Sequence, residues 1–257
     1  MSRNRTARRL MVTALATALA LSACGTPPAD GTPLSGTLAV FAPTSLTEVL
    51  SKLVQTFQAT HSGVVVKIVF GADSESSQRA TVGTTGAAVL ITEGPAPITA
   101  LGASVTTPVR LATDQLVIAI PLGDPKGIAS VADLARPDLH VVTCAQTEPC
   151  GTLSAAVLSA AGVSLPATAT TAPDVRAARA EVQAGTADAA LVYRTDTRAA
   201  ADRVDTVEFA QSSAALAHVE AVAVANRPSP QTAQAFLDFL TADPAQAAFA
   251  AAGFQAP

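Results

Sequence analysis

Residues 37–70 read TLAVFAPTSLTEVLSKLVQTFQATHSGVVVKIVF, and this stretch alone indicates the fold class. Short apolar runs at 37–42 and 64–70 predict two buried strands. The apolar residues between them recur at helical spacing, which predicts an amphipathic helix. Ser45 stands at the start of this helix and Glu48 follows three residues later, in the pattern of a capping box. A strand, a helix and a strand in this order predict two parallel strands joined by a right-handed crossover.

The rest of the chain repeats this alternation. Residues 74–84 predict a second helix and residues 87–92 a third strand, so the chain opens with a βαβαβ unit. Later strands are predicted over residues 114–121, 140–144, 188–193 and 218–226. Helices are predicted over residues 123–139, 151–162, 172–187, 194–203 and 229–254, with a break at Pro244.

Two such α/β runs predict a protein of two lobes that close on each other like a clamshell. We expect one lobe to comprise residues 37–115 and 222–257 and the other to comprise residues 116–221, with strands at 114–120 and 218–224 crossing between them. In open α/β sheets, ligands lie beyond the carboxyl ends of strands, beside helix N-termini. The junctions of interest are therefore Ser45, residues 71–77, 149–152 and 173–175, and Tyr193 with Arg194.

Residues 1–23 have the composition of a secretory signal, in which four arginines and no acid precede a short apolar run. A membrane anchor, the alternative, needs about 20 apolar residues. The sequence LSAC at 21–24 resembles a bacterial lipobox, which implies cleavage before Cys24 and lipidation of that residue; the alternative is an ordinary cleavage site. Residues 24–36, rich in proline and glycine, would then be a flexible tether. We favour the general secretory route over the twin-arginine route.

Composition and charge narrow the range of functions. The chain is 49% hydrophobic with 4% aromatic residues and no tryptophan, which allows a core of small aliphatic side chains. Removing the signal's four arginines leaves 12 of the 16 basic residues against 20 acidic residues, a net charge of −8. An acidic protein of this kind is a poor candidate for nucleic-acid binding.

The cysteines at 144 and 150 form a separate pair once Cys24 is lipidated. In an oxidising compartment, we expect Cys144 and Cys150 to close a small disulfide loop. A metal site is the competing interpretation. It would need further ligands, and the three histidines are scattered along the sequence.

Residues 69–79, VFGADSESSQR, present a contradiction. An apolar strand ends at Gly71, and serines then open a helix, which is how backbone N–H groups and hydroxyls form an anion site. Asp73 and Glu75 lie inside the same loop, although a carboxylate repels an anion. Catalysis is not indicated: the chain lacks a GxSxG elbow, a phosphate-binding GxxxxGK[ST] loop and an HExxH metal motif.

Three segments resemble the periplasmic molybdate-binding proteins of ABC importers, the ModA family. They are LAVFAPTSLTEVL at 38–50, LARPDLHVVTCAQTEPCG at 134–151 and DVRAARAEVQAGTADAALVYRTDT at 174–197. The resemblance extends from about residue 37 to residue 254. It implies an α/β clamshell of the type II periplasmic-binding-protein class with a hinge of crossover strands. It also implies a monomer at the outer face of the cell membrane that delivers molybdate or tungstate to an ABC permease and its ATPase, without enzymatic activity or a cofactor.

In that family a tetrahedral dianion is held by hydroxyl and backbone N–H donors alone. Carried over by position, Ser45 is the first serine donor. Cys150 and Val175 supply main-chain N–H groups, and Tyr193 supplies its hydroxyl from the hinge side.

Two positions depart from the family pattern. Asp73 stands where a serine donor is expected, and Ala88 stands where the family has an aspartate. An ionised Asp73 beside a dianion would cost several kcal/mol in a desolvated cleft, about 4 at an effective dielectric constant near 20. Three explanations stay open: Ser74 takes over as donor, Asp73 binds while protonated, or the solute differs. Beside molybdate capture we therefore keep a different small solute, recognised by Asp73, and a lipoprotein with a degenerate cleft that acts as a sensor or interaction module.

Overall fold

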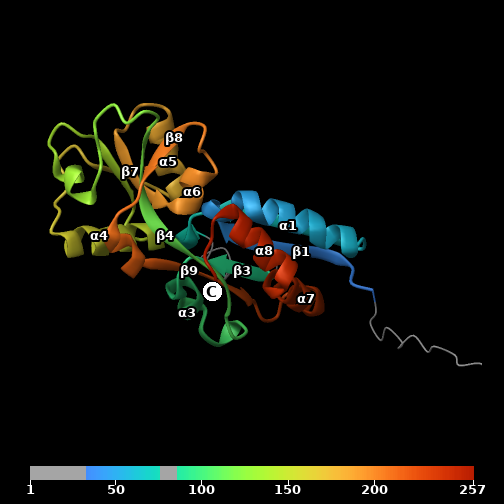
Figure 1. Cartoon of the computed structure of the whole chain (residues 1–257). Helices are drawn as coiled ribbons and strands as arrows, with labels where there is room; N and C mark the ends of the chain where they lie inside the picture. Colours follow the sequence, from blue (N-terminus) through green and yellow to red (C-terminus); the bar gives the residue numbers. More distant parts are fainter. Residues whose placement is uncertain (1–32, 76–85) are drawn as a thin grey trace, which may run out of the picture. The chain divides into compact units, whose positions relative to one another are not determined.

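Nine strands form one continuous sheet in residues 33–75 and 86–257, the part that the computed structural model describes (Figure 1). The strand order is β2-β1-β3-β9-β4-β7-β5-β6, and β8 pairs with β4. The predicted signal, Cys24 and most of the helix expected at 74–84 lie outside the described residues. Within the described residues, no helix has the length and apolar character needed to cross a membrane.

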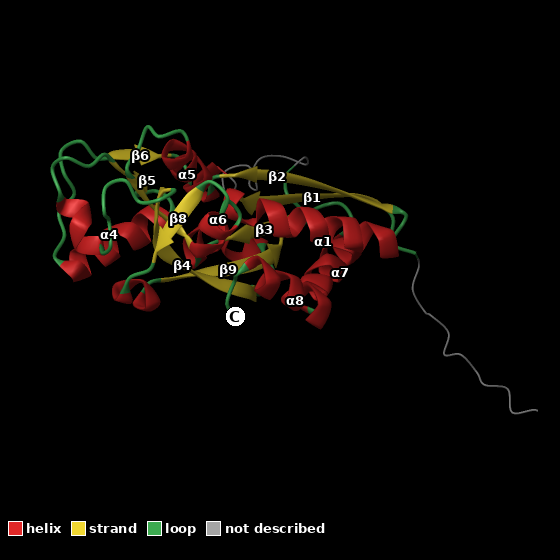
Figure 2. Ribbon diagram, turned by 45° about the horizontal axis from the view of Figure 1, so that its top comes forward, coloured by secondary structure: helices red, strands yellow, loops and turns green. Residues whose placement is uncertain are grey.

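The first three strands form the predicted parallel unit. β1 (Gly36–Pro43) lies between β2 (Val64–Gly71) and β3 (Val89–Thr92) and is parallel to both, and α1 (Thr47–Thr60) connects β1 to β2. The first helix and the parallel arrangement of the three strands expected from the sequence are therefore confirmed. Helix α1 packs with α7 (Pro230–Thr241) and α8 (Asp243–Ala252), and the predicted break at Pro244 appears as the boundary between these two helices (Figure 2).

The predicted capping box at the start of α1 is wrong. Ser45 lies in a 3₁₀ turn, Thr44–Leu46, and the residue that caps α1 is Leu46, which makes no side-chain cap bond. The Ser45 hydroxyl instead donates to the carboxylate of Glu93, far away in sequence. A buried acceptor from another strand has therefore replaced the local partner that the sequence pattern indicated.

Two long strands join the halves of the sheet, as predicted. β4 (Val109–Pro121) and β9 (Leu216–Ala223) are antiparallel partners. β9 also pairs with β3, while β4 also pairs with β7 (Ala189–Tyr193) and β8 (Val204–Val207). β4 begins at Val109 rather than at residue 114, because it is buried along most of its length and pairs with β9 before the hinge.

The second half of the sheet is again parallel at its centre. β5 (Val141–Cys144) pairs in parallel with β6 (Thr170–Ala172) and β7. The predicted helices appear as α4 (Pro149–Ala161), α5 (Val175–Gln183) and α6 (Arg194–Arg198). The helix predicted at 123–139 is wrong: only a 3₁₀ turn, Val131–Ala135, forms there, since prolines and glycines interrupt the segment. α3 (Pro95–Leu101), β6 and β8 were not predicted.

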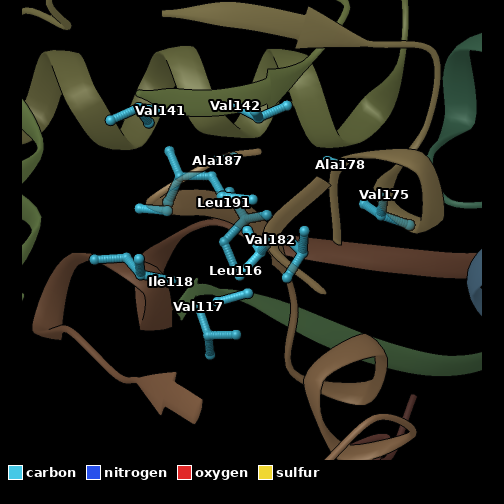
Figure 3. Close-up of a cluster of buried hydrophobic side chains, with 14 of the residues drawn as sticks. Leu116, Val117, Ile118, Val141, Val142, Val175, Ala178, Val182, Ala187 and Leu191 are labelled. Carbon is cyan, nitrogen blue, oxygen red and sulfur yellow. The ribbon is translucent and has the colours of Figure 1, made fainter. Parts of the chain in front are cut away.

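Two large hydrophobic cores divide the described chain, and a third, smaller cluster that includes Phe41, Leu90 and Val222 lies beside the first. One contains residues between Leu38 and Ala112 and between Val219 and Phe254; the other contains residues between Leu116 and Ala217. We call the surroundings of these cores lobe 1 and lobe 2. Figure 3 shows the second core, where strand residues such as Leu191 pack against Val182 of α5. β4 and β9 each contribute residues to both cores, so the chain passes from one lobe to the other within these two strands. The exact lobe boundaries given above stay a prediction.

Candidate functional site

A small cavity lies where the carboxyl ends of parallel strands from both lobes meet. Its lining includes Asp73 and Glu93 from lobe 1 and Glu148, Cys150 and Val175 from lobe 2. Its volume is about 10 Å³. One water molecule needs roughly 10–15 Å³ of such space, so the cavity is almost filled by the protein itself.

A first series of hydrogen bonds in the cleft links residues that follow three strands of lobe 1. The Ser45 hydroxyl, after β1, donates to the carboxylate of Glu93, directly after β3. The Glu93 N–H in turn donates to Asp73 Oδ2 at 2.8 Å, and Asp73 follows β2. All three residues are buried. Ser45 and Asp73 thus lie in the same region, as expected for residues that follow neighbouring strands. Glu93 lies between them and contacts both.

A second series of hydrogen bonds connects lobe 2 to lobe 1. Glu148 immediately precedes helix α4, and its Oε2 accepts from the backbone N–H of Asp73 at 2.8 Å and of Ser74 at 3.4 Å. Its Oε1 accepts from the Ser74 hydroxyl. Ser74 is therefore a donor, as one of the three explanations for Asp73 required. In the structure, its acceptor is a carboxylate of the same chain.

Two helix N-termini and one tyrosine complete the surroundings. Cys150 and Val175 lie in the first turns of α4 and α5, where N–H groups have no acceptor within the helix. Cys150 is joined to Cys144 by a disulfide with the Cα atoms 5.7 Å apart, which ties the start of α4 to the end of β5. Tyr193 ends β7 and is fully buried.

The carboxyl groups of this cleft are shifted toward their neutral forms. Burial raises the pKa of Asp73 from its ordinary value of 3.8 to about 7; the N–H of Glu93 opposes this shift, and the charge of Glu148 adds to it. Burial, and then the nearby Asp73, raise the pKa of Glu93 well above its usual range. Burial and the Glu93 charge likewise raise the pKa of Tyr193, so its hydroxyl keeps its proton.

Three of the six residues predicted as ligand donors, Asp73, Cys150 and Val175, line the small cavity. Ser45 and Ser74 donate to carboxylates that line it, and Tyr193 interacts with Glu93. The sequence interpretation missed Glu93 and Glu148. Both carry a signal that was available in the sequence: Glu93 directly follows an apolar strand, and Glu148 directly precedes the junction at residues 149–152. Ala88, noted above as a departure, is buried just before β3, where its N–H donates to Ala39. Among the described residues, no group of three or more His, Cys, Asp or Glu side chains is arranged to hold a metal ion.

A second group of buried acids lies at the hinge. Asp114 of β4 accepts a hydrogen bond of 2.5 Å from the Thr195 hydroxyl, and Asp196 lies 3.9 Å from the guanidinium of Arg179. Burial is the main cause that raises the pKa of both Asp114 and Asp196 from 3.8 to about 7. The hinge therefore holds two more carboxyl groups that the folded state favours in the protonated form.

The buried acids predict an unusual dependence of stability on pH. Between pH 3.8 and about 7 the unfolded chain releases protons that Asp73, Asp114 and Asp196 still hold in the folded chain. The free energy of unfolding therefore falls as pH rises through this window and levels off above it. Urea unfolding should give a higher stability at pH 5.5 than at pH 8, and Asp114→Asn should reduce the difference. Equal or lower stability at pH 5.5 would contradict the assignment.

Two larger cavities are lined by residues of the contacts described above. One of about 530 Å³ includes Ser45, Glu48 and Lys52 in its lining. The other, of about 460 Å³, includes Glu93, Glu148 and His218, together with apolar residues of α3 and the start of α4. Glu93 and Glu148 thus form part of both the small cavity and the 460 Å³ cavity.

Comparison with known proteins agrees with this architecture. Residues 38–255 match the family described as bacterial extracellular solute-binding proteins. The chain belongs to this family. The molybdate-binding protein ModA of Mycobacterium tuberculosis is 33% identical to this solute-binding protein over 92% of the chain and 93% of the relative. The identical figures apply to ModA of Mycobacterium bovis.

Solved structures share the fold at lower identity. The periplasmic molybdate-binding protein of Azotobacter vinelandii superposes with a TM-score of 0.73 and 18% identity, over 86% of this chain and 99% of that one. The sulfate-binding protein SubI of Mycobacterium tuberculosis gives a TM-score of 0.70 and 20% identity, over 85% and 86%. The predicted two-lobed α/β fold and the resemblance to the ModA family are therefore confirmed.

Proposed function

We propose that this protein is the extracytoplasmic solute-binding component of an ABC importer and that it captures molybdate or tungstate between its lobes. In this proposal Cys24 carries a lipid anchor, residues 24–36 form the tether, and the closed monomer delivers the oxyanion to a permease and its ATPase. The proposal concerns binding rather than catalysis and requires no cofactor. The sequence similarity that supports this proposal is the 33% identity to proteins that are named molybdate-binding proteins.

One observation carries the proposal: donors from both lobes converge on a single point. The hydroxyls of Ser45 and Ser74 already hold carboxylate groups there. The first turns of α4 and α5 border the same cavity through Cys150 and Val175. Hydroxyls and helix N-termini are the donors that bind tetrahedral anions without a cationic side chain. A donor set that holds a carboxylate is chemically suited to an oxyanion as well.

The buried acids fit an oxyanion ligand only if they are neutral when it binds. Asp73, with its pKa raised to about 7, and Glu93, with its pKa raised further, need little or no free energy to be protonated near neutral pH. A protonated carboxyl group donates a hydrogen bond and so changes from a repulsive neighbour to a ligand donor. This is the second of the explanations considered for Asp73.

A second candidate is supported by the same acids. Four carboxyl groups, those of Asp73, Glu93, Glu148 and Asp174, line the small cavity. Together with the neighbouring cavity of about 460 Å³, they suit a small organic solute that carries hydrogen-bond donors, such as an amine. The fold and the proposed transport role would be unchanged. Binding of such a solute that is lost in Asp73→Ser would favour this candidate over molybdate.

Ser45→Ala tests the oxyanion assignment. Loss of one hydrogen bond to a charged ligand should weaken molybdate and tungstate binding by about tenfold or more. Calorimetric titration of the purified protein with molybdate, tungstate and sulfate measures this directly. Ser51→Ala is the matched control, because Ser51 is exposed on α1 and donates only to the Thr47 carbonyl. Unchanged affinity in Ser45→Ala would remove Ser45 from the binding site.

A further inference from the structure

Glu148 joins the two lobes directly through its side chain. It belongs to lobe 2, at the start of α4, yet all the donors that its side chain engages belong to the loop after β2 in lobe 1. Only 4% of its surface is exposed. A carboxylate that receives two backbone N–H groups and one hydroxyl from the opposite lobe is bound in the way that a ligand oxyanion would be bound.

Glu148 is also poorly explained as a structural residue of its own helix. It occupies the N-cap position of α4, but its side chain makes no cap hydrogen bond there. Among the described residues, no lysine or arginine forms an ion pair with Glu148 or with Glu93. Both carboxyl groups are instead held by donors of the cleft, Ser74 and Ser45 respectively.

We infer that Glu148 is an internal anion that occupies part of the oxyanion's donor set, closes the lobes without ligand and thereby sets the affinity of the cleft. This inference rests on the proposed function and adds a specificity-determining residue to it. A solute can reach the Ser74 hydroxyl and the N–H groups of Asp73 and Ser74 only by displacing this carboxylate. The remaining cavity of about 10 Å³ leaves no room for both.

The structure also provides a place for the displaced side chain. Glu148 lines the cavity of about 460 Å³ on the other side, so rotation of its side chain could carry the carboxylate out of the small cavity. His218 lines that larger cavity, and its Nδ1 has no hydrogen-bond partner within the described residues. The titratable groups that share these two cavities with Glu148 are Asp73 and Glu93 on the lobe 1 side, Asp174 at the start of α5, and His218 on β9.

The first test measures the lobes without ligand. Spin labels at Gln55 of α1 and Ala201 after α6, both exposed, report the distance between the lobes. Glu148→Ala should shift the distance distribution of the purified protein to larger values, and Glu148→Gln should give an intermediate shift. Glu48→Gln is the matched control: Glu48 pairs with Arg176 across the lobes but is half exposed, and such pairs contribute little. Its distribution should stay close to that of the unchanged protein.

The second test titrates the same variants with molybdate at pH 7.5. Glu148→Gln should bind at least about tenfold more tightly than the unchanged protein, and Glu48→Gln should bind equally. Circular dichroism and thermal unfolding check that each variant is folded. Unchanged lobe distances together with unchanged affinity in both Glu148 variants would overturn the inference. Opening of the lobes without molybdate binding by any variant would instead overturn the proposed function, and with it the role of Glu148 in affinity.

Discussion

Asp73→Ser should bind molybdate about tenfold more tightly than the unchanged protein at pH 8 and about 100-fold more tightly at pH 9. At pH 6 the two should differ by less than about twofold. The unchanged protein must protonate Asp73 before a dianion enters, and with a pKa of about 7 each further pH unit makes this tenfold harder. The serine variant has no such requirement, so its affinity should show little dependence on pH above 7.

Calorimetry across pH 6 to 9 measures this difference, with the ratio of the two affinities as the readout. Asp202→Ser is the matched control, since Asp202 is exposed after α6 and lies outside the cleft lining. The proton taken up on binding by the unchanged protein should also appear as a dependence of the measured heat on the buffer. A constant affinity ratio across this pH range would mean that Asp73 does not control access to the cleft.

Gly151→Ala should lower the free energy of unfolding by about 3 kcal/mol or more, beyond the usual cost of one extra methyl group. A Cβ at this position would lie 2.5 Å from the carbonyl carbon of Ala145 and 2.7 Å from the carbonyl oxygen of Cys144. Both neighbours are backbone atoms of the loop that the disulfide closes, so they cannot move away at low cost. The variant should also lose solute binding, because the first turn of α4 borders the cleft.

Thermal unfolding should show this as a decrease in Tm of roughly 6–12 °C, at about 2–4 °C per kcal/mol for a chain of this size. Gly94→Ala is the control, because Gly94 also lies next to the cleft and has an extended backbone. A Cβ added at Gly94 would have the Pro149 side chain as its nearest neighbour, at 3.9 Å. That variant should stay within about 0.5 kcal/mol of the unchanged protein. An unchanged Tm in Gly151→Ala would show that the loop can relax.

The sequence predicted the strands and most helices because both lobes alternate apolar runs with amphipathic segments. It also predicted the crossover pair β4 and β9, whose apolar runs are long enough to span both cores. Errors arose where tertiary contacts or local breakers outweighed the pattern. The Ser45 hydroxyl donates to Glu93 instead of capping α1. The segment around Val131, which contains prolines, forms a 3₁₀ turn instead of a regular helix. Short elements such as β6 carry too few residues to show a period.

The position of the cleft could be predicted from the sequence, but the buried acids that line it could not. Strand ends and helix starts are visible in the sequence, so Ser45, Ser74 and Tyr193 could be assigned to one region in advance. Glu93 and Glu148 look like ordinary loop acids in the sequence. Their importance comes from burial, with 6% and 4% of their surfaces exposed, and from donors supplied by distant segments. Only the folded arrangement shows that these carboxylates already occupy the serine donors.

Oxyanion binding between the lobes is tested most directly by a crystal structure of the protein grown with tungstate at pH 6, in which anomalous scattering locates tungsten. We expect one tungstate ion between Ser45 and Ser74, bordered by the first turns of α4 and α5. We also expect the Glu148 carboxylate to be displaced from the Ser74 hydroxyl. A cleft in which Glu148 still holds Ser74, with tungstate absent or bound elsewhere, would contradict the account.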